Sequence, residues 1–302
     1  MLKRSRLALA VSLSAAVLCG CGGAAETGTE AGTETAQPSP TAAKDRKHQF
    51  EAAKADCMKQ KGFTYVAYVK PEDTSEDERL RSSGDYQAMR KYRTKYGFGV
   101  FALHVYPKEM SGPGAQSEPD PNMKIQRDLS DAQLTAYHKA KDACVATAGK
   151  QVLGLTLKSN IDYYSQLAMA HKRAKAAELD GDPQLVELAG PMASCLKGKG
   201  YSVPDTKPTA LNKRGERTFM RQQSKIGQDQ RGSAAGTPKT EKMTKDTEVF
   251  QMPDLTPGAA RPYLAKEIKA ALDDLECGKD FYAAYAPKET ALQRKINDQF
   301  AF

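Results

Sequence analysis

Tryptophan is absent from the sequence, and other large aromatic side chains are scarce: 13 Tyr and 9 Phe in 302 residues, with a mean hydropathy of −0.62. A chain with so few large apolar side chains has little material for one deep core, so its core should be spread over several amphipathic elements. The sequence also has no P-loop, dinucleotide-binding glycine pattern, His-Glu-x-x-His or Gly-x-Ser-x-Gly motif. We therefore predict no cofactor and no catalytic residue.

Histidine is also scarce, and its four residues lie far apart in the sequence. The four His are His48, His104, His138 and His171. No two of them lie one helical turn apart, which is the spacing that a helical metal site uses. We therefore interpret each as a surface or core residue and predict no metal site.

Long apolar runs are missing as well, and the longest one near the N-terminus covers residues 7–18. It is too short to span a bilayer, which takes about 20 helical residues, and the three basic residues before it are typical of a secretory signal. The run closes on Leu18-Cys19-Gly20-Cys21, which resembles the bacterial lipoprotein box. The resemblance implies a signal peptide at 1–20 and a diacylglycerol thioether on Cys21, and cleavage nearby without lipidation is the alternative.

The residues that follow lack large apolar side chains. Residues 21–43 consist almost wholly of Gly, Ala, Thr, Glu, Ser, Gln and Pro. Such a composition cannot offset its ordering entropy, so we predict a disordered tether. Removing 1–20 with its three basic residues lowers the formal charge from +8 to +5. This mild basic excess suits an anionic envelope surface and does not argue for nucleic acid.

Cysteine usage fits export. Without Cys19 and Cys21, the chain retains Cys57, Cys144, Cys195 and Cys277. An even number of cysteines in an exported chain indicates two disulfides, with free buried thiols as the alternative. A structural zinc site is disfavoured because such sites pair their cysteines at short spacing and these four are single and far apart.

An eight-residue motif occurs twice, as 57–64 and as 195–202, and we call it the repeated motif. Four of its positions are identical and three exchange similar residues. Each copy indicates the end of a helix, a glycine stop and an aromatic residue that begins the next segment. The second cysteines have a similar spacing, which favours two structural repeats of about 135 residues, at 44–155 and 156–302. Coincidence around a common helix-stop pattern is the alternative.

The repeat suggests a disulfide connectivity. Equivalent halves should close equivalently, which predicts the pairs Cys57–Cys144 and Cys195–Cys277. The alternative that stays open is cross-pairing, with Cys57–Cys195 and Cys144–Cys277, which would link the halves.

The periodicity predicts a mainly α protein, disulfide-stabilised, in two similar α-rich halves, with a short β-hairpin. Capping patterns predict helix starts at Ser75, Ser130, Asp182 and Thr256. The aromatic and β-branched stretches 63–69 and 97–106 predict the two hairpin strands. Residues 227–245 have almost no apolar side chain, which indicates a mobile polar insertion.

Several motifs together resemble a known group. They are Cys-Met-x-x-x-Gly-Phe-x-Tyr at 57–65, Tyr-Gly-Phe-Gly at 96–99, Leu-Ser-x-x-Gln-x-x-x-Tyr at 129–137 and Cys-Leu-x-x-x-Gly-Tyr-x-Val at 195–203. With the lipoprotein box and tether, they resemble a group of exported actinobacterial lipoproteins. The resemblance covers most of the mature chain and implies an extracytoplasmic location and disulfides. It implies no mechanism, and the chain departs from the group in its polar 227–245 stretch and in lacking Trp.

Three further patterns have simple interpretations. Ser194 and Lys197 match the Ser-x-x-Lys motif of penicillin-binding enzymes, but the sequence offers no convincing partner motif, so we interpret the match as chance. Asp273, Asp274 and Glu276 fit the solvated face of an amphipathic helix. A set of aromatic residues near Lys and Arg predicts either core or a sugar-stacking surface: Tyr92, Tyr96, Phe98, Phe101, Tyr106, Tyr163 and Tyr164.

These observations predict a lipid-anchored protein on the outer face of the cell membrane. Its expected function is non-enzymatic binding of an envelope protein or wall polymer. An envelope hydrolase, or an accessory to one, is the alternative from another class, and a structural spacer is a third. A hydrolase requires buried titratable groups gathered in a cleft, whereas a binding module requires an exposed aromatic or basic surface.

Overall fold

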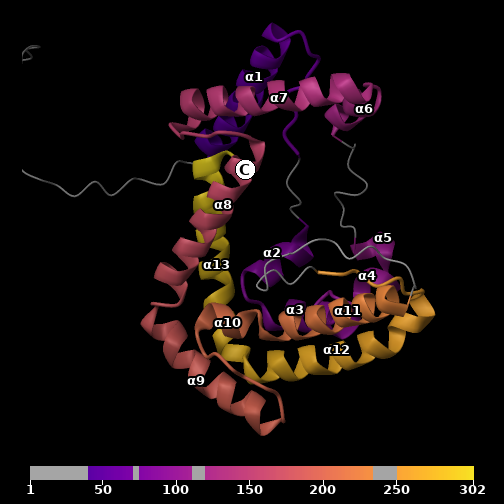
Figure 1. The fold of residues 1–302 in the computed structure, drawn as a ribbon. Helices are drawn as coiled ribbons and strands as arrows, with labels where there is room; N and C mark the ends of the chain where they lie inside the picture. The colour runs from indigo at the N-terminus through magenta and orange to yellow at the C-terminus, as the bar shows by residue number, and fades with distance from the viewer. Residues whose placement is uncertain (1–39, 71–74, 111–119, 234–249) are drawn as a thin grey trace, which may run out of the picture. The chain divides into compact units, whose positions relative to one another are not determined.

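Helices dominate the computed structural model, which describes residues 40–70, 75–110, 120–233 and 250–302 (Figure 1). Its α-helices are α1 (Pro40–Gln60), α2 (Glu76–Ser82), α3 (Tyr86–Tyr96), α4 (Ala102–Val105), α5 (Pro107–Met110), α6 (Pro121–Arg127), α7 (Asp131–Ala148), α8 (Asn160–Ala174), α9 (Pro183–Gly198), α10 (Pro208–Asn212), α11 (Arg214–Ser233), α12 (Pro257–Cys277) and α13 (Lys279–Phe300). Two π-helical turns, η2 (Gly149–Leu153) and η3 (Lys175–Leu179), follow α7 and α8. The prediction of a mainly α protein is confirmed.

The helix starts follow the capping patterns of the sequence. Ser130 makes a full capping box with Gln133, in which side chain and backbone bond reciprocally. Asp182 caps α9 by accepting a hydrogen bond from the Leu185 N–H, and Thr256 caps α12 in the same way. Each cap satisfies a backbone donor that the first helical turn leaves without a partner.

The predicted β-hairpin is not formed in the described residues. Residues 63–70 are extended, but the amide of Val66 donates to the Asn122 side chain (2.8 Å) and its carbonyl accepts from the same side chain (2.9 Å). Asn122 is almost fully buried at the start of α6. One amide side chain thus supplies both bonds that a neighbouring strand would have supplied at Val66.

The second predicted strand is wrong for a different reason. Residues 97–106 contain turns and α4, and the buried carboxylate of Glu267 on α12 binds the backbone amides of Phe98, Val100 and Phe101, each at 2.8 Å. Amides that converge on one carboxylate are not available to a strand ladder. A distant acidic residue therefore overrides the local β propensity of this stretch.

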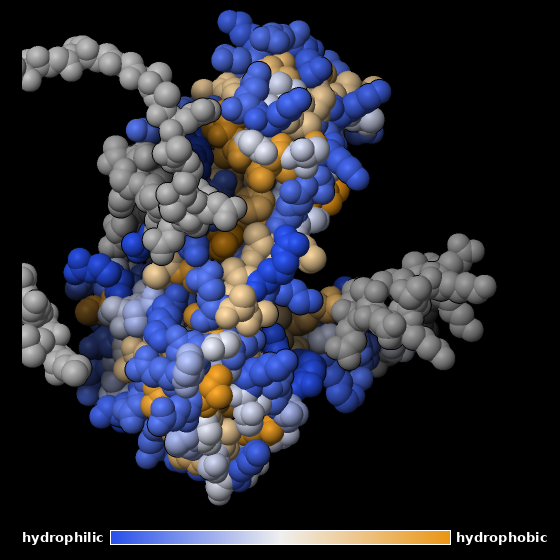
Figure 2. Space-filling model, turned by 90° about the vertical axis from the view of Figure 1, so that its left-hand side faces the viewer, coloured by the Kyte–Doolittle hydropathy of each residue, from blue (hydrophilic) through white to orange (hydrophobic). Residues whose placement is uncertain are grey.

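The helices pack through three apolar clusters. The largest lies among η2, α8, α9 and α13, and a second joins α4 to α12, which runs alongside α3 (Figure 1). The third surrounds Met58 and Tyr137 beside Cys144, where α1 packs on α7. One face of the molecule is mostly hydrophilic, and apolar residues reach it in separate patches (Figure 2). The core is thus divided, as the scarcity of large apolar residues predicts.

The described helices belong to one compact unit, residues 37–302. Within it α12, from the second predicted repeat, packs on α3 and α4 of the first, and α13 packs on α1. Helix α11 continues through 227–233 of the polar stretch, and the rest of that stretch lies outside the described residues. Among those residues, no helix combines the length and apolarity that crossing a membrane requires.

Candidate functional site

Two disulfides are present, Cys57–Cys144 and Cys195–Cys277, which is the pairing of equivalent halves. They span 87 and 82 residues, and in both the two Cα atoms lie 5.5 Å apart. The cross-paired alternative is therefore not formed. The predicted lipid attachment residue, Cys21, lies outside the described residues.

Both copies of the repeated motif end their helix in the same way. The Phe63 N–H donates to the Met58 carbonyl (3.0 Å), and the Tyr201 N–H donates to the Leu196 carbonyl (2.9 Å). The glycine between has φ of 82° at Gly62 and 85° at Gly200. These are the bonds of a Schellman cap, which needs a left-handed residue that only glycine adopts without strain. The sequence repeat is thus a structural repeat at these two helix ends.

The enzyme-like motifs of the sequence are not assembled into a site. Ser194 and Lys197 are both exposed on α9. His104 bonds to Gln223 and His171 to Asn297, on different elements. The described part of the chain contains no group of three or more His, Cys, Asp or Glu that could hold a metal ion. The remaining candidates for a site are the buried charged groups and the clefts.

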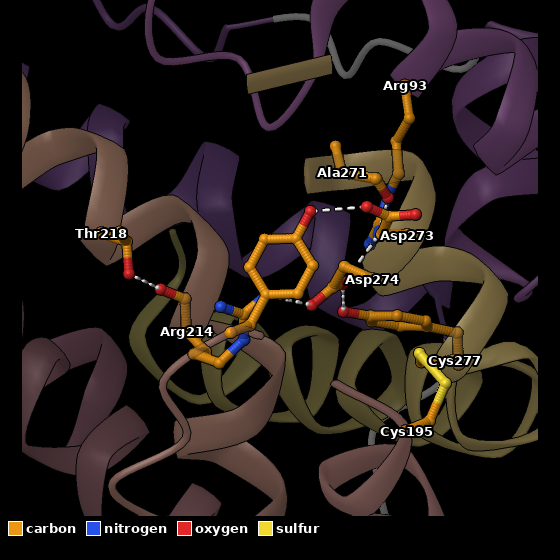
Figure 3. A network of polar contacts seen from close by, with 10 residues as sticks. Arg93, Cys195, Arg214, Thr218, Ala271, Asp273, Asp274 and Cys277 are labelled. Atoms are coloured by element: carbon orange, nitrogen blue, oxygen red, sulfur yellow. Dashed lines mark hydrogen bonds and ion pairs between the residues drawn. A yellow bond between two sulfur atoms is a disulfide. The ribbon is translucent and has the colours of Figure 1, made fainter. Parts of the chain in front are cut away.

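Of the three acidic residues interpreted as a solvated face, Glu276 is exposed, Asp273 is partly buried and Asp274 is not on that face at all. Asp274 is fully buried and binds two arginines, with Arg93 Nη1 at 2.8 Å and Arg214 Nη2 at 3.1 Å (Figure 3). The hydroxyl of Tyr282 also donates to Asp274, and Arg93 makes a further bond to the Ala271 carbonyl (2.9 Å). A buried charge must be paired in this way to remain ionised. We call these residues the Asp274 cluster.

Titration shifts agree with this geometry. Burial and the adjacent Asp274 carboxylate both raise the pKa of Tyr282. Burial alone would lower the pKa of Arg93, but attraction to Tyr282 and Asp274 raises it above its ordinary value. Two cations thus share one buried anion, and the cluster carries a surplus of positive charge.

The neighbouring carboxylates are held differently. Asp273 accepts bonds from Lys269 (2.7 Å), Lys199 (3.1 Å) and the Tyr201 hydroxyl, and Glu276 accepts from Lys199 (2.8 Å). Hydrogen bonds from Lys269 and Tyr201 hold the pKa of Asp273 well below its usual range. These side chains connect the second copy of the repeated motif to α12, so their role here is structural.

A cleft of about 590 Å³ lies among α1, α8, α13 and the extended segment after the first copy of the repeated motif. We call it the aromatic cleft. Aromatic and amide side chains are among the residues that line it: Tyr68, Tyr163, Tyr164, Phe302, Asn160 and Gln293. The Tyr164 and Phe302 rings pack edge to face at 6.1 Å, and about half of each side chain is exposed, at 49% and 50%. This arrangement offers ring faces beside hydrogen-bonding amides.

A buried lysine also lines the aromatic cleft. Lys54 is only 8% exposed and pairs with Glu51, whose second carboxylate oxygen accepts from the Tyr65 hydroxyl at 2.9 Å. Burial lowers the pKa of Lys54, and the pairing with Glu51 partly offsets that effect. Both Glu51 oxygens are therefore engaged within the protein.

A second cleft, of about 500 Å³, borders α11 and the segment after the second copy of the repeated motif. Arg214, Arg217 and Arg221 line it, beside Met220 and Phe250. We call it the arginine cleft. Because the three arginines lie at i, i+3 and i+7, they share one face of α11.

The predicted aromatic surface is divided in the structure. Tyr96, Phe98, Phe101 and Tyr106 belong to the cluster around α4 and α12, where Phe101 is fully buried. Tyr163 and Tyr164 lie elsewhere, in the aromatic cleft, where Tyr164 is the more exposed. Tyr92 is partly buried and packs on Tyr96. The single surface expected from the sequence therefore becomes one core cluster and one cleft.

The sequence analysis did not identify Arg214, Arg217 and Arg221 of α11 as candidate site residues. Their helical spacing is the signal that could have identified them, since 208–226 otherwise reads as polar and weakly helical. Comparison of the chain with protein-family models, with curated proteins and with solved structures finds no match. The site must therefore be interpreted from its own chemistry.

Proposed function

We propose that this protein is a lipid-anchored binding module on the outer face of the cell membrane, and that its aromatic cleft binds a glycan of the cell wall. The lipoprotein box with Cys21 and the tether at 21–43 support the location. The two disulfides are consistent with it, because such bonds persist outside the reducing cytosol. The two similar α-rich halves serve as the scaffold of the cleft.

The exposed pair of Tyr164 and Phe302 is the observation that carries the proposal. Large side chains on a soluble surface are usually scattered singly, whereas these two meet at a cleft. A sugar ring has an apolar face that packs on an aromatic ring and hydroxyl groups that bond to amides. The exposed Gln293, together with Asn160, supplies amides in the same cleft.

The hydrolase alternative has less support. Glycoside hydrolysis takes two carboxyl groups placed on either side of the bond, one of them free to give a proton. Two carboxyl groups line the aromatic cleft: Glu51 is bound by Lys54 and Tyr65, and Asp298 is buried and is also engaged within the protein. The surface therefore favours binding over turnover, and the spacer alternative leaves the exposed rings without a role.

The test is cosedimentation of the purified full chain with insoluble cell-wall glycan. We expect binding that Tyr164→Ala weakens about two- to tenfold, in line with the ~0.5–1.5 kcal/mol that an aromatic contact contributes. Met169→Ala is the matched control, because Met169 lies on the same helix, is 51% exposed and does not line the cleft. Equal binding by Tyr164→Ala and the parent chain would refute the assignment of the site.

Two further measurements separate the alternatives. Release of soluble sugars that Glu51→Gln abolishes would establish a hydrolase instead. Crosslinking in cells that recovers one reproducible protein and no glycan would transfer the binding role to a protein partner. The anchor is tested separately, because Cys21→Ser should release the chain to the medium, and retention in the membrane would contradict lipidation.

A further inference from the structure

We infer that the arginine cleft is a second binding site, which takes a phosphomonoester joined to an apolar group. This site is separate from the aromatic cleft, since the lining residues of the two clefts do not overlap. The inference therefore does not depend on the glycan proposal. It rests on charge, on two exposed arginines and on the apolar part of the lining.

Positive charge exceeds negative charge at this cleft. The Asp274 cluster places Arg93 and Arg214 on one buried carboxylate, and Arg214 also lines the cleft. Arg217 and Arg221 add two exposed guanidinium groups, for which the described residues provide no ion pair. The lining itself holds three arginines and one acidic residue, Asp205, which leaves a formal charge of +2. A phosphomonoester carries about −1.5 to −2 at pH 7, which matches this excess.

The buried guanidinium of Arg214 has an unused donor. Arg214 is only 8% exposed, and its Nε is buried without a hydrogen-bond partner in the part of the chain that the structure describes. Leaving a charged donor buried and unpaired costs free energy, so such groups are normally satisfied. Its Nη2 is bound to Asp274 and its Nε is closed off from solvent, so Arg214 contributes positive charge at the wall of the cleft rather than a direct bond through Nε.

Guanidinium geometry favours a phosphoryl group over a single carboxylate. Arginine forms paired, parallel hydrogen bonds with phosphate oxygens. Three arginines on one helix face can together contact several oxygens, whereas a carboxylate has two. The hydroxyl of Ser202 also lines the cleft and supplies a further donor, whereas the Thr218 hydroxyl donates to the Arg214 carbonyl (2.9 Å).

The rest of the lining is apolar. Met220 and Phe250 are 38% and 42% exposed, and both border the cleft together with Pro204 and Ala210. A bare phosphate ion would leave these side chains exposed to water. A ligand with an attached apolar group would cover them and remove their apolar surface from water, which favours binding.

The test is calorimetric titration of the purified full chain with hexyl phosphate, inorganic phosphate and hexanol. We expect hexyl phosphate to bind at least tenfold more tightly than inorganic phosphate, with no measurable binding of hexanol. Equal affinity for the two phosphates would overturn the apolar half of the proposal. Failure of hexyl phosphate to bind would overturn all of it.

Variants then assign the contacts. Arg217→Ala and Arg221→Ala should each weaken hexyl phosphate binding tenfold or more, because each removes a charged hydrogen bond. Both residues are exposed, so the chain should still fold. Arg231→Ala is the matched control, an exposed arginine of α11 outside the cleft that should change the affinity less than twofold. Phe250→Ala should weaken hexyl phosphate and leave inorganic phosphate unaffected, and the opposite pattern would contradict the model of the site.

A phosphomonoester could come from a membrane lipid or from a soluble molecule. Flotation of full chain carrying Cys21→Ser with vesicles of phosphatidylcholine, with and without phosphatidic acid, distinguishes the two. Binding to the acidic vesicles that Arg217→Ala abolishes identifies a lipid headgroup. Binding of hexyl phosphate without vesicle flotation identifies a soluble ligand, and both results support the site. Flotation that Arg217→Ala and Arg231→Ala reduce equally would indicate non-specific attraction and refute it.

Discussion

In the first copy of the repeated motif the aromatic residue is Phe63, which packs edge-on against Tyr137 at 5.6 Å. In the second copy it is Tyr201, whose hydroxyl donates to Asp273 and whose ring lies beneath the Arg214 guanidinium at 5.2 Å. The backbone hydrogen bonds of the two helix ends are nevertheless the same. The two helix ends thus share the same backbone cap, but the aromatic residue makes an apolar contact in the first copy and polar contacts in the second.

The segments that leave the two copies show the same contrast. Residues 68–70 line the aromatic cleft, and Ser202, Pro204 and Asp205 line the arginine cleft. The chain that continues from each copy therefore borders a cleft, and the two clefts differ in chemistry, although the lining positions do not correspond one to one along the repeat. The backbone of the helix end is shared by the two copies, and the side chains around each copy give the neighbouring cleft its chemistry.

The residue three positions before the second cysteine marks the difference most clearly. In the first half it is Lys141, which is partly exposed, and in the second it is Asp274, which is fully buried between arginines. Opposite charges thus stand three residues before the second cysteine of each disulfide, and of these two residues Asp274 is the one at the centre of a buried ionic cluster.

Removal of a disulfide should have the largest effect and should affect the halves equally. Replacing both cysteines of either pair by Ala should lower the free energy of unfolding by about 4.5 kcal/mol, because the loops have nearly the same length and the chain-entropy model depends only on length. Urea denaturation of the two double variants measures this. A difference of more than about 1.5 kcal/mol would mean that the surroundings of each bond, and not its loop, determine its contribution.

Asp274→Ala should be the most damaging single substitution in the comparison. It leaves Arg93 and Arg214 buried without their anion, which typically costs about 3–5 kcal/mol. Lys141→Ala, at the corresponding position of the first half, should change stability by less than about 0.5 kcal/mol. Comparable losses in thermal and urea unfolding would show that the Asp274 cluster is not a specific feature of the second half.

The two cap glycines should respond alike. Gly62→Ala and Gly200→Ala should each cost about 1–2 kcal/mol, because both have positive φ and an added Cβ would meet nothing within 4 Å, which leaves backbone strain as the cost. Gly190→Ala within α9 also meets nothing within 4 Å, at a helical φ, and should stabilise by about 0.5–1 kcal/mol. Unequal costs at Gly62 and Gly200 would argue against equivalent helix ends.

Local features of this fold were open to prediction from the sequence. Helix starts such as Ser130 and Asp182 depend on residues within one turn, and the glycine stops depend on the repeated motif itself. The number of disulfides followed from cysteine count and export signals. Each of these inferences uses neighbours in the sequence or simple counting, where the physics is local.

The features that escaped prediction depend on distant partners. Val66 is bound by Asn122, 56 residues away, and the amides after Gly97 are bound by Glu267, up to 169 residues away. Asp274 is buried because Arg93 and Arg214 approach it from two other helices. A local pattern of hydrophobic or β-branched residues does not indicate such distant partners. It therefore predicted strands at 63–69 and 97–106, and it placed Asp274 on a solvated helix face.

The smallest expected effect concerns pH and again separates the halves. Asp273 lies four residues before Cys277, where the first half has the buried Ala140 before Cys144. Hydrogen bonds from Lys269 and Tyr201 lower the pKa of Asp273 in the folded state, so the unfolded chain takes up this proton first as the pH falls. The stability that Asp273 contributes is therefore present above its ordinary pKa of about 4 and is lost below it.

Asp273→Asn should accordingly cost roughly 1 kcal/mol at pH 6, a value typical of partly exposed ion pairs, and less as the pH falls to about 2. Urea midpoints measured across this range for the parent chain and the variant give the difference directly. Ala140→Ser is the control in the first half, because it adds no titrating group and should shift all midpoints by a constant amount. A gap between Asp273→Asn and the parent chain that stays constant with pH would show that Asp273 acts through packing, and the electrostatic contrast between the halves would then rest on Asp274 alone.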